Sequence, residues 1–221
     1  MRLLDTFLSR TFKGSKMHSR LIALDGDGVL IDYHEGYAMA WERAFDERPK
    51  VKDPNGYHPK DYWDVPELDL AGQIHLKERG FTREVWESMP IIAGAAQACG
   101  LLVDAGFELV CVTALSARYQ KERGLNLKNA GIPVTTVHTV GHAGLGNPKA
   151  VMIKKLSPAA FVDDYLPYLQ GLQGVTWKAL IKGRPNNSPN ELKGFKPPDS
   201  VHTSLLEFAE FWLTRNAKYT D

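Results

Sequence analysis

The chain has 221 residues and a formal net charge of +1, with 43% hydrophobic and 24% charged residues. A chain of this length and composition can build one domain with a substantial core, together with a smaller inserted unit. The balanced charge gives no reason to expect nucleic acid or an anionic membrane surface as a partner, and the longest apolar run, residues 91–103, is too short to span a bilayer.

The cysteines and the first residues bear on where the protein works. Cys99 and Cys111 lie in apolar stretches, so we interpret them as buried thiols in a reducing compartment and expect a cytoplasmic location. Residues 1–17 place several leucine and phenylalanine side chains near one helical face. We interpret them as an N-terminal amphipathic arm folded on the body. An upstream start preceding Met17 and an organelle transit peptide are the alternatives.

The first predicted strand ends in a pair of carboxylates. Residues 21–24 (LIAL) form a short apolar run typical of a buried strand, and Asp25 and Asp27 follow, each before a glycine. Like charges this close repel each other, and burying either of them costs several kcal/mol unless a cation or a reacting phosphate is nearby. Taken alone, this stretch is also typical of a simple turn.

Residues 33–89 interrupt the pattern of strands. They contain no strand-like run, aromatic residues recur at helical spacing, and prolines mark irregular connections. We predict a small helical insertion that covers the carboxyl end of the first strand, where ligands bind in open parallel sheets. Its aromatic side chains could stack on a nucleobase or a sugar, but a small unit also needs large side chains to make a core, and we favour the core.

From residue 90 onward, short apolar strands alternate with helices. This alternation predicts an α/β fold with a Rossmann-like three-layer arrangement, in which helices cover both faces of a parallel sheet. The segment 183–199 is a long polar loop rich in proline and asparagine. We predict strands at 108–112, 133–140, 159–162 and 176–181, and helices at 95–105, 117–130, 148–156, 165–172 and 204–217.

Further polar groups follow the later strands. Thr113 and Ala114 offer a hydroxyl and a backbone N–H where a helix is about to begin, which is an anion-binding arrangement. Lys149 lies in the first turn of a predicted helix, and Asp163 and Asp164 end the fourth predicted strand, where they could also simply cap the next helix. Together with the first carboxylate pair, these acids need a hard divalent cation such as Mg²⁺, which prefers oxygen ligands, to neutralise them.

Four short motifs resemble those of the haloacid dehalogenase superfamily, in the order that this family has. They are LIALDGDGV, VCVTA, the lone lysine of NPKA, and FVDD. The resemblance covers roughly residues 18–32 and 90–182. It implies a core formed by residues 18–32 and 90–221, and it makes residues 33–89 the mobile cap that members of this family insert after the first strand.

The resemblance also implies a role for each candidate residue. Asp25 would be the nucleophile that forms an aspartyl-phosphate, and Asp27 would be the general acid and base. Thr113, the amide of Ala114 and Lys149 would bind the phosphoryl oxygens. The Mg²⁺ ligands would be Asp25, the backbone carbonyl of Asp27, Asp164, and Asp163 acting directly or through water.

These roles favour phosphate monoester hydrolysis among the reactions of the family. Dehalogenases of the superfamily lack the second acid of the first motif, so Asp27 argues against that chemistry. A phosphonatase would use a cap lysine, and nothing in the sequence marks one of them as desolvated. A phosphomutase would keep both acids of the first motif; mutase, phosphonatase and non-catalytic phosphate-binding protein stay as alternatives. The cap lysines are Lys50, Lys52, Lys60 and Lys77.

The sequence thus predicts a Mg²⁺-dependent phosphatase that acts on a small phosphorylated metabolite, and it identifies neither that substrate nor the oligomeric state. Arg118, Arg123 and Asn126 follow Thr113 along a predicted helix. One of them could make a second phosphate contact, but we interpret Arg123 as a solvated surface residue.

Overall fold

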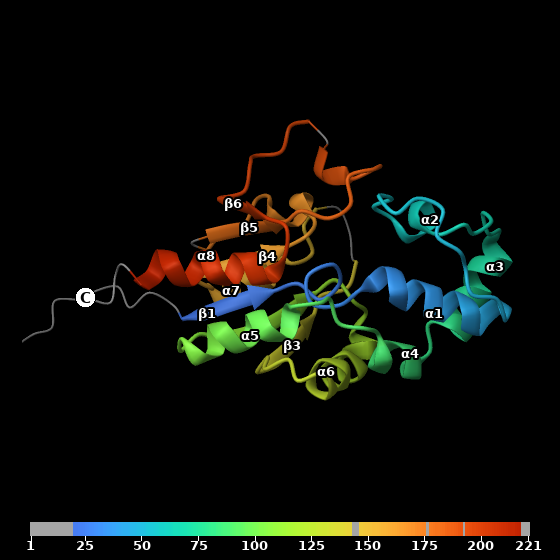
Figure 1. Cartoon of the computed structure of the whole chain (residues 1–221), viewed down its shortest axis with the longest axis horizontal. Coiled ribbons are helices and arrows are strands. Elements are labelled where there is room, and N and C mark those ends of the chain that lie inside the picture. Colours follow the sequence, from blue (N-terminus) through green and yellow to red (C-terminus); the bar gives the residue numbers. More distant parts are fainter. Residues whose placement is uncertain (1–19, 143–145, 176, 192, 218–221) are drawn as a thin grey trace, which may run out of the picture.

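The computed structural model describes residues 20–142, 146–175, 177–191 and 193–217, so the arm predicted for residues 1–17 lies outside the described part of the chain. Within these residues, six parallel strands form one sheet in the order β3-β2-β1-β4-β5-β6 (Figure 1). The strands are β1 (Leu21–Leu24), β2 (Glu108–Thr113), β3 (Thr136–Thr139), β4 (Ala160–Asp163), β5 (Trp177–Ile181) and β6 (Ser200–His202). Because β1 lies between β2 and β4, the carboxyl ends of these three strands meet at one edge.

Helices cover both faces of the sheet, because the side chains of a buried strand point alternately to the two faces. Leu24 belongs to a buried cluster that includes Phe208, whereas its neighbour Ala23 belongs to a second cluster that includes Ile153. The three layers confirm the predicted α/β fold class. The helices around the sheet are α5 (Ala95–Asp104), α6 (Gln120–Asn129), α7 (Ala150–Leu156) and α8 (Leu205–Ala217), with 3-10 turns η2 (Ala117–Tyr119), η3 (Leu166–Leu169) and η4 (Pro189–Glu191).

Between β1 and α5 the described chain forms helices, turns and isolated bridges but no strand of the sheet. We call residues 33–89 the helical segment; in Figure 1, α1, α2 and α3 lie beyond the tip of the β1 arrow. Asp32 begins α1 by accepting a hydrogen bond from the backbone N–H of Glu35 at 3.2 Å. The elements of this segment are α1 (Tyr33–Phe45), α2 (Pro59–Tyr62), α3 (Leu70–His75), the π-helix η1 (Leu76–Gly80) and α4 (Arg83–Ser88).

Aromatic rings make much of the interior of the helical segment. Trp41 and Trp86 are both buried. The ring of Phe81 stacks on Tyr33 and on Trp86, with centroids 6.1 and 5.3 Å apart. These contacts support the interpretation of the aromatic residues as core, and the same buried cluster continues to Leu24 of β1.

The structure differs most from the predicted elements at two places. The helix predicted at 165–172 is the short 3-10 turn η3, because Pro167 lies in its first turn and Gly171, with φ of 66°, follows its end. The edge strand β6 was not predicted, because three residues after a polar loop carry too little periodicity to be recognised.

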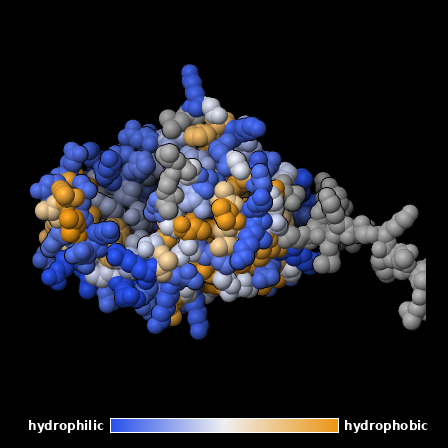
Figure 2. Space-filling model, turned by 180° about the vertical axis from the view of Figure 1, so that it is seen from behind, coloured by the Kyte–Doolittle hydropathy of each residue, from blue (hydrophilic) through white to orange (hydrophobic). Residues whose placement is uncertain are grey.

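The face of the molecule in Figure 2 is mostly hydrophilic, and the two cysteine thiols are buried, as the sequence analysis led us to expect of them. Hydrophilic side chains cover most of the face seen in Figure 2, with apolar groups in smaller areas between them. Cys99 and Cys111 are both free and buried, as their apolar surroundings indicated. Among the described residues, the structure contains no helix with the length and apolar character required to cross a membrane.

The packing of α8 on the sheet predicts how much stability is lost when a buried side chain of this helix is shortened. Phe208 is fully buried, so Phe208→Ala should lower the free energy of unfolding by about 3–5 kcal/mol. Urea unfolding followed by circular dichroism measures this loss. The control is Val151→Ala on α7, where the side chain is 82% exposed and the expected change is within about 0.5 kcal/mol. Equal effects of the two substitutions would contradict the packing described here.

Candidate active site

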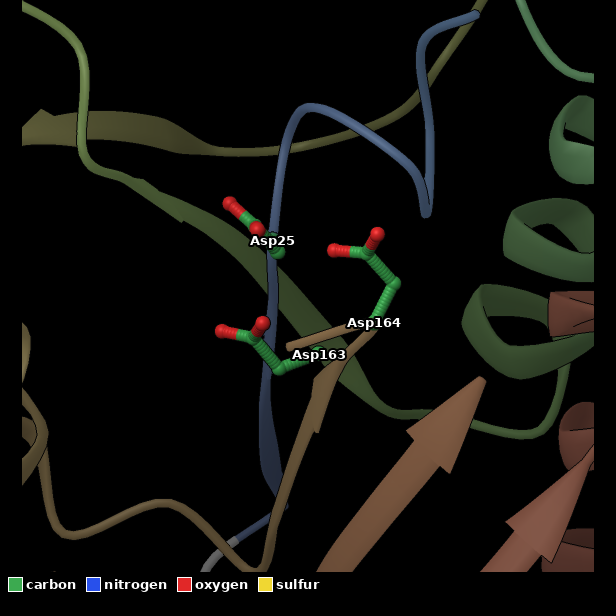
Figure 3. Close-up of side chains that lie close together, drawn as sticks. All are labelled: Asp25, Asp163 and Asp164. Carbon is green, nitrogen blue, oxygen red and sulfur yellow. The ribbon is translucent and has the colours of Figure 1, made fainter. Parts of the chain in front are cut away.

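Three carboxylates from neighbouring strands meet at the carboxyl edge of the sheet (Figure 3). Asp25 directly follows β1, Asp163 is the last residue of β4, and Asp164 comes next. One oxygen from each of the three lies within 4.8 Å of the others. The parallel pairing of β1 with β4 explains this meeting, because it continues into a hydrogen bond from Asp25 N–H to the carbonyl of Val162 at 2.9 Å.

A single buried lysine joins two of these carboxylates. The Nζ atom of Lys149 lies 2.7 Å from Oδ1 of Asp25 and 2.7 Å from Oδ2 of Asp163, and the lysine side chain is fully buried. The backbone of Lys149 is held in turn, because its N–H donates to Oδ1 of Asn147 at 2.9 Å. Lys149 thus fixes the carboxylate of Asp25 relative to that of Asp163.

The cluster carries more negative charge than Lys149 neutralises. Burial, assisted by the charges of Asp163 and Asp27, raises the pKa of Asp25 to about 7, although Lys149 opposes this shift. Burial and the neighbouring carboxylates raise the pKa of Asp164 well above its ordinary value. Carboxylate oxygens in this arrangement are the donors that Mg²⁺ prefers, so the residues present fit a divalent cation.

Thr113 and Gly26 form the contact between β2 and the loop after β1. Thr113 ends β2 and is 1% exposed, and Ala114 follows it. A Cβ atom added to Gly26 would lie only 3.2 Å from Oγ1 of Thr113, and the N–H of Gly26 donates to Oδ1 of Asp25 at 2.6 Å. The absence of a side chain at Gly26 therefore brings the threonine hydroxyl close to the base of the carboxylate cluster.

A tight loop carries the chain from Asp25 back toward the helical segment. The N–H groups of Leu30 and Ile31 both donate to the carbonyl of Gly26 at 2.9 Å. Gly28 adopts φ of 81°, and a Cβ atom there would overlap the carboxylate of Asp164. Both the positive φ and the close contact with Asp164 require glycine at this position. The glycine allows the loop to pass directly over Asp164.

The side chain of Asp27 leaves the cluster of three carboxylates. Its Oδ1 atom accepts a hydrogen bond from Nη2 of Arg123 at 2.7 Å, and the carboxylate remains 31% exposed. Its predicted contribution to metal binding was the backbone carbonyl, and that stays a prediction. Asp25 and Asp27 are only two positions apart in the motif, but their side chains therefore lie in different surroundings.

The interpretation of Arg123 as a solvated surface residue was wrong. Its side chain is fully buried, with the guanidinium carbon 5.4 Å from the centre of the Trp86 ring. The reason is that α6 packs against α4 of the helical segment. Asn126, one turn further along α6, is also buried and donates to the backbone carbonyl of Met89 at 2.8 Å. Arg118, by contrast, is exposed.

Two residues near the site were missed by the sequence analysis. The hydroxyl of Tyr57, from the helical segment, lies 3.4 Å from Oδ2 of Asp164. Nδ2 of Asn190, from the polar loop between β5 and β6, donates to the backbone carbonyl of Asp164 at 2.8 Å. Asn190 comes from a polar loop that gave no functional signal, and Tyr57 is one of the aromatic residues of the insertion, which we interpreted as core rather than as ligand contacts.

The same polar loop holds the helical segment from one side. Asn186 pairs with Gly56 in an isolated parallel bridge, and its N–H donates to the carbonyl of Asn55 at 2.9 Å. Arg184 donates to the carbonyl of Pro54 at 3.1 Å and lies over the ring of Tyr62 at 4.4 Å. These contacts bring Tyr57 to the carboxylates. The four lysines considered for a Schiff base, Lys50, Lys52, Lys60 and Lys77, are all exposed.

Comparison with known proteins identifies the fold. No protein-family model matches the sequence, and no curated protein matches it either. Among solved structures, a HAD family hydrolase from Deinococcus radiodurans R1 with bound phosphate and sodium is similar with a TM-score of 0.56 and 17% identity, over 90% of this chain and 96% of that chain. L-2-haloacid dehalogenase from Xanthobacter autotrophicus is similar with a TM-score of 0.56 and 14% identity, over 89% and 98%.

A third similar structure is D,D-heptose 1,7-bisphosphate phosphatase from B. bronchiseptica complexed with magnesium and phosphate. Its TM-score is 0.51 at 16% identity, over 88% of this chain and 98% of that chain. At these identities the likeness establishes the fold. The chain has the fold of the haloacid dehalogenase-like hydrolases, as the four sequence motifs predicted.

The excess of buried negative charge predicts that Mg²⁺ stabilises the protein. A cation that binds only the folded state should raise the free energy of unfolding by about 2.7 kcal/mol at a hundredfold excess over its Kd. Thermal unfolding at increasing Mg²⁺ concentration measures this effect. Asp164→Asn should remove most of it, whereas Glu67→Gln, at an exposed position of the helical segment, should not. An equal response of both variants would contradict the assigned ligands.

The raised pKa of Asp25 predicts a pH dependence in the presence of a chelator. The folded protein holds this proton up to about pH 7, whereas the unfolded chain releases it near the ordinary value of 3.8. The contribution of Asp25 to stability is therefore full below about pH 4 and is lost as the pH rises through about 7. Asp25→Asn should raise the urea midpoint at about pH 8 but not at about pH 4. A difference that does not change with pH would contradict this assignment.

Proposed function

We propose that this protein is a Mg²⁺-dependent phosphomonoester hydrolase of the haloacid dehalogenase superfamily, which acts through an aspartyl-phosphate on a small phosphorylated metabolite. The observation that carries the proposal is the position of Asp25, at the carboxyl end of the central strand β1 and 2.7 Å from the buried Lys149. The fold and the four motifs support the same reaction class.

Asp25 is suited to be the nucleophile because, among the residues that the structure describes, only its Oδ1 atom has a hydrogen-bond partner. Oδ1 accepts hydrogen bonds from Lys149 and from the N–H of Gly26, which fixes the plane of the carboxylate. In the first half of the reaction, Oδ2 forms a bond to phosphorus while the bond between phosphorus and the ester oxygen breaks. The product is an alcohol and a phosphorylated Asp25.

Asp27 transfers the proton in both halves of the reaction. As a carboxylic acid it protonates the departing ester oxygen, and it is left as a carboxylate. In the second half this carboxylate takes a proton from the water that attacks phosphorus. Inorganic phosphate leaves, and Asp25 is restored. The partial exposure of Asp27 suits this role, because it must reach both the leaving group and water.

The remaining groups neutralise and orient the phosphoryl group. Thr113 ends β2, Ala114 follows it, and Lys149 directly precedes α7; in the proposed reaction the hydroxyl, the amide and the ammonium group donate to the phosphoryl oxygens. Asp25, Asp163, Asp164 and the backbone carbonyl of Asp27 would hold Mg²⁺. When bound, the ion supplies positive charge that reduces the repulsion between carboxylate and phosphate.

We infer that the helical segment acts as a cap over this site, with a core formed by residues 18–32 and 90–221. Tyr57 supports this division, because it reaches Asp164 from the segment. The exposed cap lysines give no support to a phosphonatase, since a Schiff-base lysine needs a desolvated amine. Asp27 speaks against dehalogenation, because a halide leaves without a proton. We place the enzyme in the cytoplasm, with small molecules as its substrates.

The test is hydrolysis of 4-nitrophenyl phosphate by the purified protein with Mg²⁺ and with a chelator. We expect turnover that requires Mg²⁺ and that Asp25→Asn lowers by roughly a thousandfold or more. Acid quenching followed by peptide mass analysis should find the phosphoryl group on the peptide that contains Asp25. Glu67→Gln serves as the control and should leave turnover unchanged.

Three outcomes would overturn the proposal, and the third is the action of a mutase. One is release of chloride from 2-chloropropionate without hydrolysis of any phosphate ester, which would favour a dehalogenase. The second is binding of Mg²⁺ and phosphate without turnover of esters or sugar phosphates, which would favour a non-catalytic binding protein. Conversion of a sugar phosphate to its isomer, rather than to sugar and phosphate, would favour a mutase.

A further inference from the structure

The burial of Arg123 has a large unfavourable desolvation free energy. Its guanidinium is fully enclosed, yet two of its three nitrogen atoms, Nε and Nη1, have no hydrogen-bond partner among the described residues. Buried polar groups in folded proteins are nearly always hydrogen-bonded, and a buried charge costs several kcal/mol that a single partner rarely offsets. Replacing a buried ion pair by apolar side chains of similar size is often neutral or stabilising, so stability alone does not explain the arginine.

In the described part of the chain, the guanidinium has one hydrogen-bond partner, and this partner is Asp27, the acid of the proposed mechanism. Nη2 of Arg123 donates to Oδ1 of Asp27 at 2.7 Å. Within the described residues, the other oxygen of that carboxylate, Oδ2, makes no hydrogen bond or ion pair, and the carboxylate is 31% exposed. The arginine thus holds one oxygen of the carboxylate, and the other oxygen stays available for proton transfer.

The guanidinium is itself held in place by the packing around α6. The face of α6 that bears Arg123 also bears Asn126, whose amide donates to the backbone carbonyls of Met89 and Glu87 at 2.8 and 3.1 Å. Trp86 covers the guanidinium at 5.4 Å. The loop that carries Asp27 is short and turns sharply, so the fixed arginine gives its side chain one defined direction.

We propose that Arg123 is a positioning residue for proton transfer at Asp27. The inference rests on the phosphatase reaction proposed above. With Oδ1 tied to Arg123, the proton that Asp27 gives to the ester oxygen, and later takes from water, sits on Oδ2. Without the arginine the carboxylate rotates freely, and proton transfer is slowed in both halves of the reaction while attack by Asp25 is not.

Three aryl esters with leaving groups of different acidity separate these steps: phenyl phosphate and its 4-nitro and 2,4-dinitro derivatives. Nitro groups stabilise the departing phenolate, so the dinitro ester leaves without a proton and the phenyl ester does not. The value of kcat/KM reports formation of the phosphoryl-enzyme. Arg123→Gln should lower it by about tenfold or less for the dinitro ester and by roughly a hundredfold or more for phenyl phosphate, the usual range for a lost general acid.

The ratio between the esters is unaffected by partial misfolding, because a smaller active fraction lowers all three values equally. Arg123→Lys, which keeps the charge, should recover part of the ratio. The matched control is Arg83→Gln, because Arg83 pairs with Glu122 across the same contact between α4 and α6 without touching Asp27. It should leave the ratio unchanged.

A second readout follows the later half of the reaction. In the Arg123→Gln variant, hydrolysis of phosphorylated Asp25 should become rate-limiting with the dinitro ester. Stopped-flow mixing should then give a burst of dinitrophenolate, close to one per active site, before slow turnover.

Equal losses for the three esters, or no loss, would overturn the assignment and leave Arg123 as a purely structural contact between α4 and α6. A wild-type protein that hydrolyses none of the esters would contradict the proposed phosphatase reaction itself, and the present inference would fall with it. Wild-type turnover thus distinguishes failure of the function from failure of the role of Arg123.

Discussion

The ion pairs of one buried lysine determine how the candidate active site is built. Lys149 lies between Asp25 and Asp163, which end two adjacent parallel strands, and its ammonium group is the only cation among the described residues that contacts the three-carboxylate cluster. Burial makes these contacts strong, but it also makes the remaining negative charge costly. The negative charge of the three carboxylates is consequently not fully neutralised, and a further cation would stabilise the folded state. Unneutralised buried charge lowers stability, and active sites often retain such interactions because function requires them.

Much of the fold and the centre of the candidate site could be predicted from sequence, because the signal lies in short stretches of neighbouring residues. Asp25, Asp163 and Thr113 each follow an apolar run directly, and parallel strands bring their ends to one edge regardless of the details of packing. The extent of the turns was less predictable. A 3-10 turn and a three-residue edge strand carry too few residues to establish a period.

Residues that approach the site from distant parts of the chain could not be predicted. Arg123 is 96 positions from Asp27, and Tyr57 is 107 positions from Asp164. Their contacts depend on how the helical segment packs on the core, which no local pattern encodes. A charged residue on a polar helix is normally solvated, and only the packing of α4 against α6 reverses that expectation for Arg123.

The two sides of the helical segment are attached to the core with different strength. At α4 the contacts are buried, and the hydrogen bond between Asn126 and Met89 is shielded from water. At the opposite side, the bonds of Arg184 to Pro54 and of Asn186 to Asp53 are exposed. Exposed hydrogen bonds open first in native-state fluctuations. Amide hydrogens near residues 55–57 and 186 should thus exchange with solvent earlier than those of α4, because the contacts with the polar loop break more readily than the contacts at α4.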